Sequence, residues 1–453
     1  MSPSPRTPQF RWPDRRSSSA WAGFDKHEPP DSALVADCVH CGFCLPTCPT
    51  YLLWGEEMDS PRGRIYLMGE VLGGEPLTKT VAGHFDKCLG CMACVTACPS
   101  GVQYDQLLGA TRAQVERQVR RSWTERLFRW AVFALFPHRR RMRVAVSGLR
   151  LYQRSGLSKL LRRTGAFEHL PLSLRTLESL APPLTGREER LPGLVKAQGT
   201  PRGRVAMLSG CVQSVLFPSV NLATARVLAT EGFEVVVPAS QGCCGALSEH
   251  SGRVEEARDF ARSLIDSFDS LSVEAVVVNS AGCGSAMKEY GHLLRDDPQF
   301  AEKAARFSNS VRDFAEFLDE RTQVAKYHPL ALRVAYHDAC HLSHAQGIKA
   351  APRRVLGKVP GLEIVDVPDG EICCGSAGVY NLFEPEAAAE LGARKAANVL
   401  ATGAQLLVAA NPGCYMQIAA ALERRHGRIA IAHTAELLYA SIRNLDTTEL
   451  GLT

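Results

Sequence analysis

Apolar and polar positions follow the same order twice in the C-terminal half of the chain. In each copy an apolar run rich in β-branched residues leads into cysteine, and a helical pattern follows. The paired segments read VAMLSGC and VAYHDAC, VVVPASQGCCG and VDVPDGEICCG, and VVVNSAGC and LLVAANPGC. Apolar runs that alternate with helices are typical of buried parallel strands in an α/β domain. We therefore predict two duplicated α/β domains, over residues 204–330 and 331–453.

Helical spacing also appears between two cysteine motifs in the N-terminal half. Ile65, Met68 and Leu72 fall on one helical face. Ser60 followed by Pro61 suits an N-cap and a first helical turn. We expect the apolar face of this helix to pack over the motifs on either side of it.

Residues 111–170 form a basic segment with a helical pattern. One stripe of this pattern is apolar and largely aromatic: Trp123, Leu127, Trp130 and Ala134. Between Arg112 and Arg163 the sequence contains 15 Lys or Arg but only two acidic residues. Such a segment suits a membrane interface or a partner subunit. The alternative is a helix packed on its own domain with a solvated basic face.

Two segments have the composition of loops. Residues 1–30 are rich in Pro, Ser and Arg, and we predict a disordered basic tail there. Residues 171–203 contain several prolines and are predicted to be a linker.

The cysteine content indicates in which cellular compartment the protein works. The chain has 16 cysteines among 453 residues, and its first 30 residues lack the apolar segment of a signal peptide. Clustered cysteines without a secretion signal favour metal ligation in a reducing compartment. No apolar run reaches the roughly 18 residues of a spanning helix. We expect a cytoplasmic protein, either soluble or peripheral on the cytoplasmic face of the inner membrane. Nucleic acid is not an expected partner, because no recognition motif accompanies the basic segment.

The strongest chemical signal lies between residues 38 and 99. The spacing Cys-x2-Cys-x2-Cys-x3-Cys-Pro occurs twice, beginning at Cys38 and at Cys88. This is the ligand run of a bacterial two-cluster ferredoxin. Structural zinc also binds Cys-x2-Cys pairs, but it has no use for a third cysteine at the same spacing. We therefore predict a helical ferredoxin-like domain with two [4Fe-4S] clusters over residues 31–110.

In such ferredoxins the fourth cysteine of each run binds the other cluster. The expected ligands of the first cluster are Cys38, Cys41, Cys44 and Cys98, and those of the second are Cys88, Cys91, Cys94 and Cys48. Arg62 and Arg64 open the helix between the motifs, where they either offset cluster charge or are solvated.

The eight remaining cysteines belong to the two repeats. They are Cys211, Cys243, Cys244 and Cys283 in the first, and Cys340, Cys373, Cys374 and Cys414 in the second. Because the carboxyl ends of parallel strands meet at one sheet edge, each set is a candidate thiolate centre, with an additional iron–sulfur centre as its cofactor. Structural burial is the alternative. His337, His341 and His344 flank Cys340 and are candidate ligands or proton carriers, or ordinary core and surface residues.

Several segments resemble one family. The segments CVHCGFCLPTCPTYLLWGEEMDSPRGRIYLMGEVLGG, KCLGCMACVTACPSGVQYDQLL, GCCGALSEH, SAGCGSAMKEYG and CCGSAGVYNLFEPE are similar to the iron–sulfur subunit of bacterial glycolate oxidase (glycolate dehydrogenase). The resemblance runs from about Asp37 to the C-terminus. A wider group shares the combination of ferredoxin motifs with Cys-Cys-Gly (CCG) repeats, and it includes subunits of lactate utilisation, anaerobic glycerol-3-phosphate dehydrogenase and heterodisulfide reductase.

The resemblance implies an electron-transfer subunit of an oxidoreductase complex. Its partners would be flavin-binding subunits that oxidise glycolate to glyoxylate, and its electrons would go toward membrane quinone. The sequence has no GxGxxG motif between a strand and a helix, and iron–sulfur clusters accept no hydride. The isolated chain is therefore expected to be inactive on glycolate, with no catalytic residue of its own.

Three alternatives to a glycolate oxidase subunit remain open. In the first, the chain is the equivalent subunit of a lactate or glycerol-3-phosphate dehydrogenase. In the second, its repeats catalyse thiol/disulfide chemistry, and in the third they only dock partner subunits. The repeats depart from the full heterodisulfide-reductase pattern, which ends in CxxC, because Ala286 and Gln417 occupy the final positions.

Overall fold

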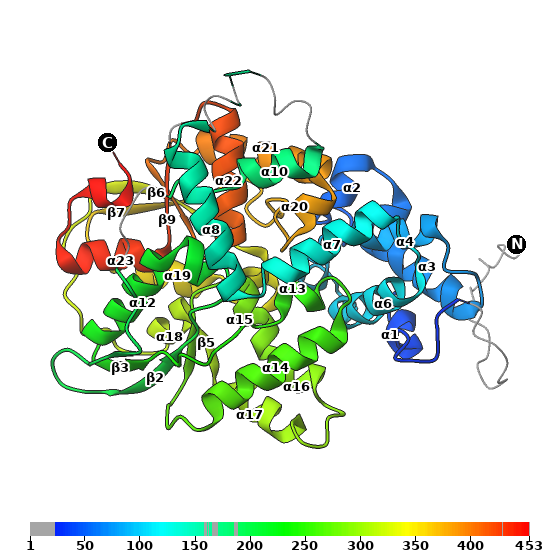
Figure 1. The fold of residues 1–453 in the computed structure, drawn as a ribbon, viewed down its shortest axis with the longest axis horizontal. Coiled ribbons are helices and arrows are strands. Elements are labelled where there is room, and N and C mark those ends of the chain that lie inside the picture. The colour runs from blue at the N-terminus through cyan, green and yellow to red at the C-terminus, as the bar shows by residue number, and fades with distance from the viewer. Residues whose placement is uncertain are drawn as a thin grey trace, which may run out of the picture.

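The computed structural model describes residues 23–157, 161, 163–164, 171–184, 189–427 and 429–452. A helical N-terminal part lies against two α/β halves, one coloured green and the other yellow to red in Figure 1. The predicted fold class, a helical N-terminal domain followed by two duplicated α/β domains, is confirmed.

The N-terminal part consists of short helices around the cysteine motifs. They are α1 (Ser32–Ala36), α2 (Pro49–Trp54), α3 (Pro61–Gly73), α4 (Lys79–Asp86), α5 (Ala93–Thr96) and α6 (Tyr104–Gln118), with a 3-10 turn, η1, at Glu57–Asp59. The predicted start of α3 is confirmed, because the Ser60 hydroxyl accepts a hydrogen bond from the Gly63 amide at 3.0 Å. Ile65, Met68 and Leu72 are buried in one core with cysteines of both motifs, as their spacing predicts.

The described residues begin inside the segment predicted to be a disordered tail. Residues 1–22 of that tail lie outside the described residues, but Phe24 is only 1% exposed and belongs to the N-terminal core. The Asp25 amide donates to Gln114 on α6 at 2.8 Å. A hydrogen bond from Arg117 lowers the pKa of the Asp25 carboxyl to about 2. These contacts anchor residues 23–30 to α6.

The first α/β half is built on a five-stranded sheet. Its strands are β1 (Leu194–Val195), β2 (Gly203–Met207), β3 (Phe233–Val236), β4 (Val276–Val278) and β5 (Val311–Asp313). They lie in the order β1-β3-β2-β4-β5, and every pairing is parallel except that of β1 with β3. The helices of this half are α11 (Gln213–Leu216), α12 (Pro218–Thr230), α13 (Ala246–Glu249), α14 (Val254–Asp269), α15 (Ala281–Lys288), α16 (Tyr290–Leu293), α17 (Ala301–Ser310) and α18 (Phe314–Asp319).

The second half repeats this plan with a four-stranded parallel sheet. Its strands, β6 (Leu332–His337), β7 (Leu362–Asp366), β8 (Leu406–Ala409) and β9 (Ala430–Ala432), lie in the order β7-β6-β8-β9. Its helices are α19 (Ala350–Leu356), α20 (Tyr380–Phe383), α21 (Pro385–Ala401), α22 (Pro412–Arg424) and α23 (Thr434–Arg443). A π-helical turn, η3 (His341–Ala345), and a 3-10 turn, η4 (Thr447–Leu450), complete it.

The two halves share one hydrophobic core. Val205 and Met207 of β2 belong to the same buried cluster as Val334 and Tyr336 of β6. The duplicated sheets therefore support each other, because apolar residues from both are removed from water together.

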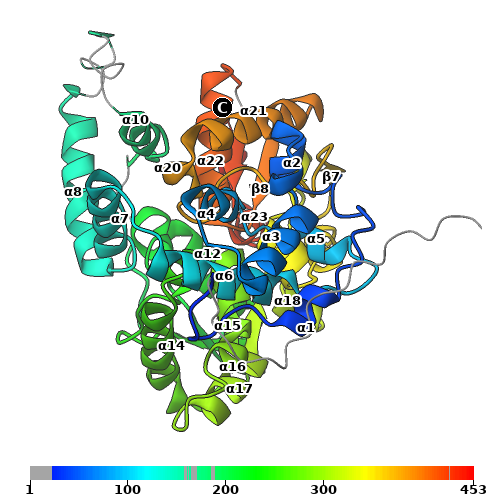
Figure 2. The same ribbon diagram turned by 90° about the vertical axis from the view of Figure 1, so that its right-hand side faces the viewer.

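Three helices cross the outside of the molecule and lie together in Figure 2: α7 (Trp123–Leu135), α8 (Arg139–Arg154) and α10 (Leu172–Ser179). The inner face of α7 packs through Val132 and Phe133 against Leu382 of α20 and against Val379, which precedes that helix. Its other stripe is open to solvent: Trp123 is 73%, Leu127 54% and Trp130 66% exposed. The segment predicted to be a linker holds α10 and the edge strand β1. No helix in the described part of the chain combines the length and apolar character needed to cross a bilayer.

Candidate metal centres

Five N-terminal cysteines line one small cavity. They are Cys38, Cys41, Cys44, Cys94 and Cys98, and they lie beside Arg62 and Ile65 at the start of α3. A second cavity lies on the other side of Cys94 and is lined by Cys48, Cys88, Cys91 and Cys94. We call these cavity one and cavity two. Cys98 thus joins the first motif and Cys48 joins the second, in the crossed grouping that the sequence predicts.

The two loops turn in the same way because the same positions are left-handed. His40 and Gly90 have φ values of 54° and 65°, and Gly42 and Met92 have φ values of 88° and 60°. Left-handed backbone is costly for His and Met, so both loops are held by their surroundings rather than by residue preference. Such tight turns bring the following cysteines of each run to one cavity.

The residues at the cavities fit [4Fe-4S] clusters. All 16 cysteines are free of disulfide bonds, and each cavity gathers at least the four thiols that a cluster needs, with Cys94 lining both. Sulfur hydrogen bonds are in place as well: the Gly90 amide lies 3.4 Å and the Tyr104 hydroxyl 3.6 Å from Cys88 Sγ. Which cysteine binds which cluster stays a prediction.

A buried arginine lies beside cavity two. Arg64 is fully buried; it donates to the His84 carbonyl at 2.6 Å and pairs with Asp59 at 3.4 Å. Burial is the largest single cause and opposes its charge, but Cys88, Tyr104, Cys48 and Asp59 together outweigh burial, so the pKa of Arg64 is raised. Burial also opposes the Cys88 thiolate, yet Arg64 and Arg112 lower the pKa of Cys88 overall. The positive charge therefore favours thiolate at this position.

Arg62 has a different environment. Its guanidinium borders cavity one, donates to the His40 carbonyl at 3.0 Å and pairs with Glu57 at 2.6 Å near the surface. Both predicted arginines thus lie at the cavities, but only Arg64 is removed from solvent.

In the first repeat the four cysteines meet at the carboxyl ends of β2, β3 and β4. Cys211 Sγ lies 3.6 Å from Cys243 Sγ, and Cys244 interacts with both Cys243 and Cys283. Gly245 is needed here, because its φ is 78° and a Cβ atom would come within 3.1 Å of the Ala257 carbonyl on α14.

In the second repeat the four cysteines meet in the same way beyond β6, β7 and β8. Cys340 interacts with Cys373, and Cys374 with Cys414. His337 brings a ring nitrogen within 4.8 Å of the Cys374 and Cys414 sulfurs. Burial lowers the pKa of His337 to about 3, so its ring is neutral at ordinary pH.

The other two predicted histidines have other contacts. The His341 ring lies 4.7 Å from that of His250, between centroids, and its Nδ1 is 3.8 Å from Cys340 Sγ. His344 Nδ1 lies 2.8 Å from the Thr96 hydroxyl at the end of α5. His344 therefore joins the second repeat to the N-terminal part.

Cavity two abuts the second repeat. Leu89 and Cys91 belong to one buried hydrophobic cluster of side chains with Cys340, Cys373 and Tyr380. No cysteine of the first repeat belongs to this cluster of described residues. Among the described residues, only the cysteines of the second repeat therefore share a buried hydrophobic cluster with a cysteine of cavity two.

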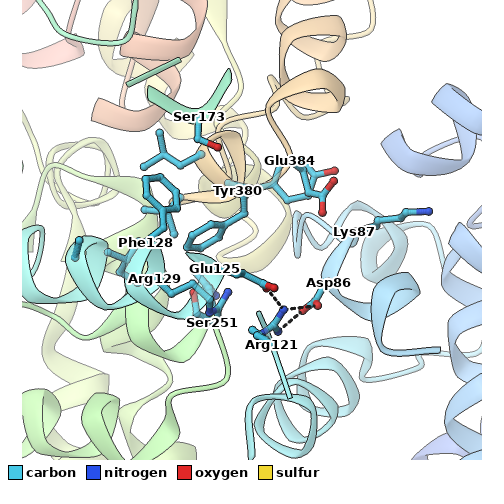
Figure 3. A pocket seen from close by; sticks show the side chains of 18 of the residues that line it. Asp86, Lys87, Arg121, Glu125, Phe128, Arg129, Ser173, Ser251, Tyr380 and Glu384 are labelled. Atoms are coloured by element: carbon cyan, nitrogen blue, oxygen red, sulfur yellow. Dashed lines mark hydrogen bonds and ion pairs between the residues drawn. The ribbon is translucent and has the colours of Figure 1, made fainter. Parts of the chain in front are cut away.

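The sequence did not reveal a pocket of about 930 Å³ between the N-terminal part, α7 and α20. Figure 3 shows Phe128, Arg129, Tyr380 and Glu384 around it, with Arg121 bridging Asp86 and Glu125 on one side. Leu89 also lines the pocket, so it lies beside the cluster that joins cavity two to the second repeat. Segments from five parts of the chain form the pocket, which is why no local motif signals it.

Family models match most of the chain. Residues 34–102 match the 4Fe-4S dicluster domain, residues 124–181 the linker region of the glycolate oxidase iron–sulfur subunit, and residues 205–288 and 334–419 the Cysteine-rich domain. The dicluster match confirms the predicted [4Fe-4S] cofactors.

Curated relatives span the same regions. The probable glycolate oxidase iron–sulfur subunit of Bacillus subtilis (strain 168) is 40% identical over 90% of this chain and 94% of its own length. The glycolate oxidase iron–sulfur subunit of Escherichia coli (strain K12) is 38% identical over the same shares. Lactate utilization protein A of an Exiguobacterium species is 32% identical over 53% of this chain and 98% of its own length.

Proposed function

The chain belongs to the family of glycolate oxidase iron–sulfur subunits, and from this premise we propose that it carries electrons from a flavin-binding subunit, which oxidises glycolate to glyoxylate, toward membrane quinone. One observation carries the proposal. Two cysteine-lined cavities share Cys94, and the second lies against another cysteine group. Adjacent redox sites in one chain suit electron transfer rather than substrate chemistry.

A [4Fe-4S] cluster, when bound, supplies one-electron redox chemistry. The residues of this chain hold it and set its potential. Arg64 and Arg112 place positive charge beside Cys88, and the Gly90 amide and Tyr104 hydroxyl lie within hydrogen-bonding reach of its sulfur. All four groups stabilise added negative charge, so they favour the reduced state at cavity two.

Hydride removal from glycolate is assigned to a partner. It requires a two-electron acceptor, which iron–sulfur chemistry does not provide. We therefore propose that the isolated chain is inactive on glycolate and that it works with flavin-binding subunits of the same complex.

The pocket near Tyr380 is a candidate exit for electrons. Its walls include Leu127, Phe128 and Leu382, and it lies beside the solvent-exposed stripe of α7. Exposed tryptophans on a basic amphipathic helix suit the interface of a bilayer. We propose that α7 rests on the cytoplasmic face of the membrane and that a quinone headgroup enters this pocket.

The test uses the purified components. The chain, isolated without oxygen, is mixed with its flavin-binding subunits, and glycolate is added while cluster absorbance is followed. Bleaching that requires both the flavin subunits and glycolate supports the proposal. Bleaching with lactate alone supports the second candidate, a lactate dehydrogenase subunit, which the lactate-utilization relatives favour. Thiol turnover by the isolated chain, lost in Cys243→Ser or Cys373→Ser, supports catalysis at the repeats instead.

A further inference from the structure

The two repeats can be superposed residue by residue through their sheets. Ala206 pairs with Val276 and Met207 with Val277 in the first sheet; Ala335 pairs with Leu407 and Tyr336 with Val408 in the second. The residue after each matched pair is therefore Leu208 in the first repeat and His337 in the second. Both are buried at the carboxyl end of the central strand.

A second position differs in the same sense. A Cβ at Gly245 would meet Ala257 and Phe260, and a Cβ at Gly375 would meet Ala388 and Leu391. These pairs set the register of α14 against α21 and match Leu264 with Lys395. Lys395 is buried, donates to the Asp369 carbonyl at 2.8 Å and interacts electrostatically with Cys373, Cys374 and Cys414. The second repeat thus has an imidazole and an ammonium group where the first has two leucines.

His337 has no ordinary explanation as a core residue. Its side chain is almost fully buried, and neither ring nitrogen has a hydrogen-bond partner among the described residues. Leaving such a group unpaired costs about 1–3 kcal/mol. A ring nitrogen within 4.8 Å of two cysteine sulfurs is, however, well placed for a metal shared with them.

We propose that the second repeat holds an iron centre whose ligands are Cys340, Cys373, Cys374, Cys414 and His337, and that the first repeat lacks the histidine ligand. Thiolate and imidazole suit zinc as well as iron. The location favours iron over zinc. Cys340 and Cys373 lie in the same buried hydrophobic cluster as Cys91 of cavity two, and zinc, which has no redox chemistry, could not exchange electrons with a cluster there. To this extent the inference rests on the proposed electron-transfer function.

The histidine gives the centre a distinct character. The neutral imidazole adds a fifth ligand to the four thiolates without adding negative charge, so the reduction potential is higher than a fifth thiolate would give. Lys395 acts in the same direction through its charge. The second repeat is therefore the one built to accept an electron.

The test uses the full chain, labelled with 15N-histidine and purified without oxygen. Iron and zinc are counted, and pulsed EPR measures nitrogen coupling in the oxidised and reduced protein. The variants are His337→Leu, which copies the first repeat, and Cys414→Ser. The matched control is Cys283→Ser, the equivalent cysteine of the first repeat.

We expect iron beyond the eight atoms of two cubanes, and a histidine coupling that Cys283→Ser retains and both His337→Leu and Cys414→Ser lose. No iron beyond eight, zinc at the site, or a coupling that persists in His337→Leu overturns the inference. If the unsubstituted chain itself lacks the eight ferredoxin irons, the proposed function is overturned instead, so the two failures are distinguishable. The same eight irons report that each variant is folded.

Discussion

Thr96 Oγ1 and His344 Nδ1 lie 2.8 Å apart and join the helix of the second cysteine motif to the second repeat. This contact stands beside the buried cluster that contains Cys91 and Cys340. The second ferredoxin motif is therefore held against the second repeat, so the proposed electron transfer between these two regions depends on packing within the chain.

Thr96→Val should weaken that junction. The substitution keeps the side-chain volume but leaves His344 Nδ1 without its partner, which costs about 1 kcal/mol of the free energy of unfolding. Chemical denaturation of the protein measures the change, and iron content should stay that of the unsubstituted chain. Thr47→Val is the matched control, because the Thr47 hydroxyl bonds only the nearby Cys44 carbonyl among the described residues. Equal rates of glycolate-dependent reduction past cavity two in Thr96→Val and the unsubstituted protein would argue against the role of this junction.

Arg64→Met should be far more damaging than Arg62→Met. Arg64 is buried, and removing it leaves Asp59 with Lys87 as its remaining ion pair and His84 as a hydrogen-bond partner among the described residues, at a cost of about 3 kcal/mol. Arg62 pairs with Glu57 near the surface, so its loss costs about 0–1 kcal/mol. The loss of positive charge beside Cys88 should also lower the reduction potential of the second cluster. Redox titration checks this, and an unchanged potential in Arg64→Met would contradict the assigned role.

Stability should depend on pH through Asp313. Burial raises the pKa of this carboxyl to about 6, above its usual 3.8. An acid with a raised pKa in the folded state binds protons more tightly there, so its contribution to stability falls as pH rises from about 4 to 6. Asp313→Asn keeps an oxygen for the cap to the Ala315 amide but cannot ionise. Relative to the unsubstituted protein, the free energy of unfolding of Asp313→Asn should rise by up to about 3 kcal/mol as the pH increases from about 4 to 6. Above about pH 6 this difference should stay nearly constant. Denaturation midpoints at several pH values measure this, and a pH-independent difference would exclude the explanation.

The exposed stripe of α7 should bind lipid. Replacing Trp123 and Trp130 by serine removes two interfacial anchors without changing the inner face of the helix. In flotation assays with anionic phospholipid vesicles, the double variant should bind at least tenfold more weakly. Val324→Ser alters an exposed apolar residue elsewhere and should leave binding unchanged. If vesicle binding persists in the double variant while the complex with the flavin subunits is lost, the stripe is a subunit contact.

Features fixed by local spacing could be predicted from the sequence. The cysteine runs, the Ser60 cap and the face of Ile65, Met68 and Leu72 depend on neighbours a few residues apart. The strand ends of the repeats could also be predicted, because β-branched runs and cysteines mark them in both copies.

Features fixed by distant contacts could not be predicted. Phe24 is buried because the segment before α1 packs into the N-terminal core and bonds α6, and nothing within residues 1–30 signals that. The sequence also could not choose among three histidines near Cys340. The strand end places His337 beside Cys374 and Cys414, while the π-helical turn places His341 between Cys340 and His250 and carries His344 to Thr96. The pocket beside Tyr380 likewise needs the assembled fold.

The crossed grouping of the eight N-terminal cysteines is tested most directly by counting iron in paired variants purified without oxygen. Cys38→Ser with Cys98→Ser removes two ligands of one cluster, so the double variant should lose about four irons relative to the unsubstituted chain. Cys38→Ser with Cys48→Ser removes one ligand from each cluster and should lose about eight. The reverse result, with the greater loss in the Cys38 and Cys98 pair, would contradict the account.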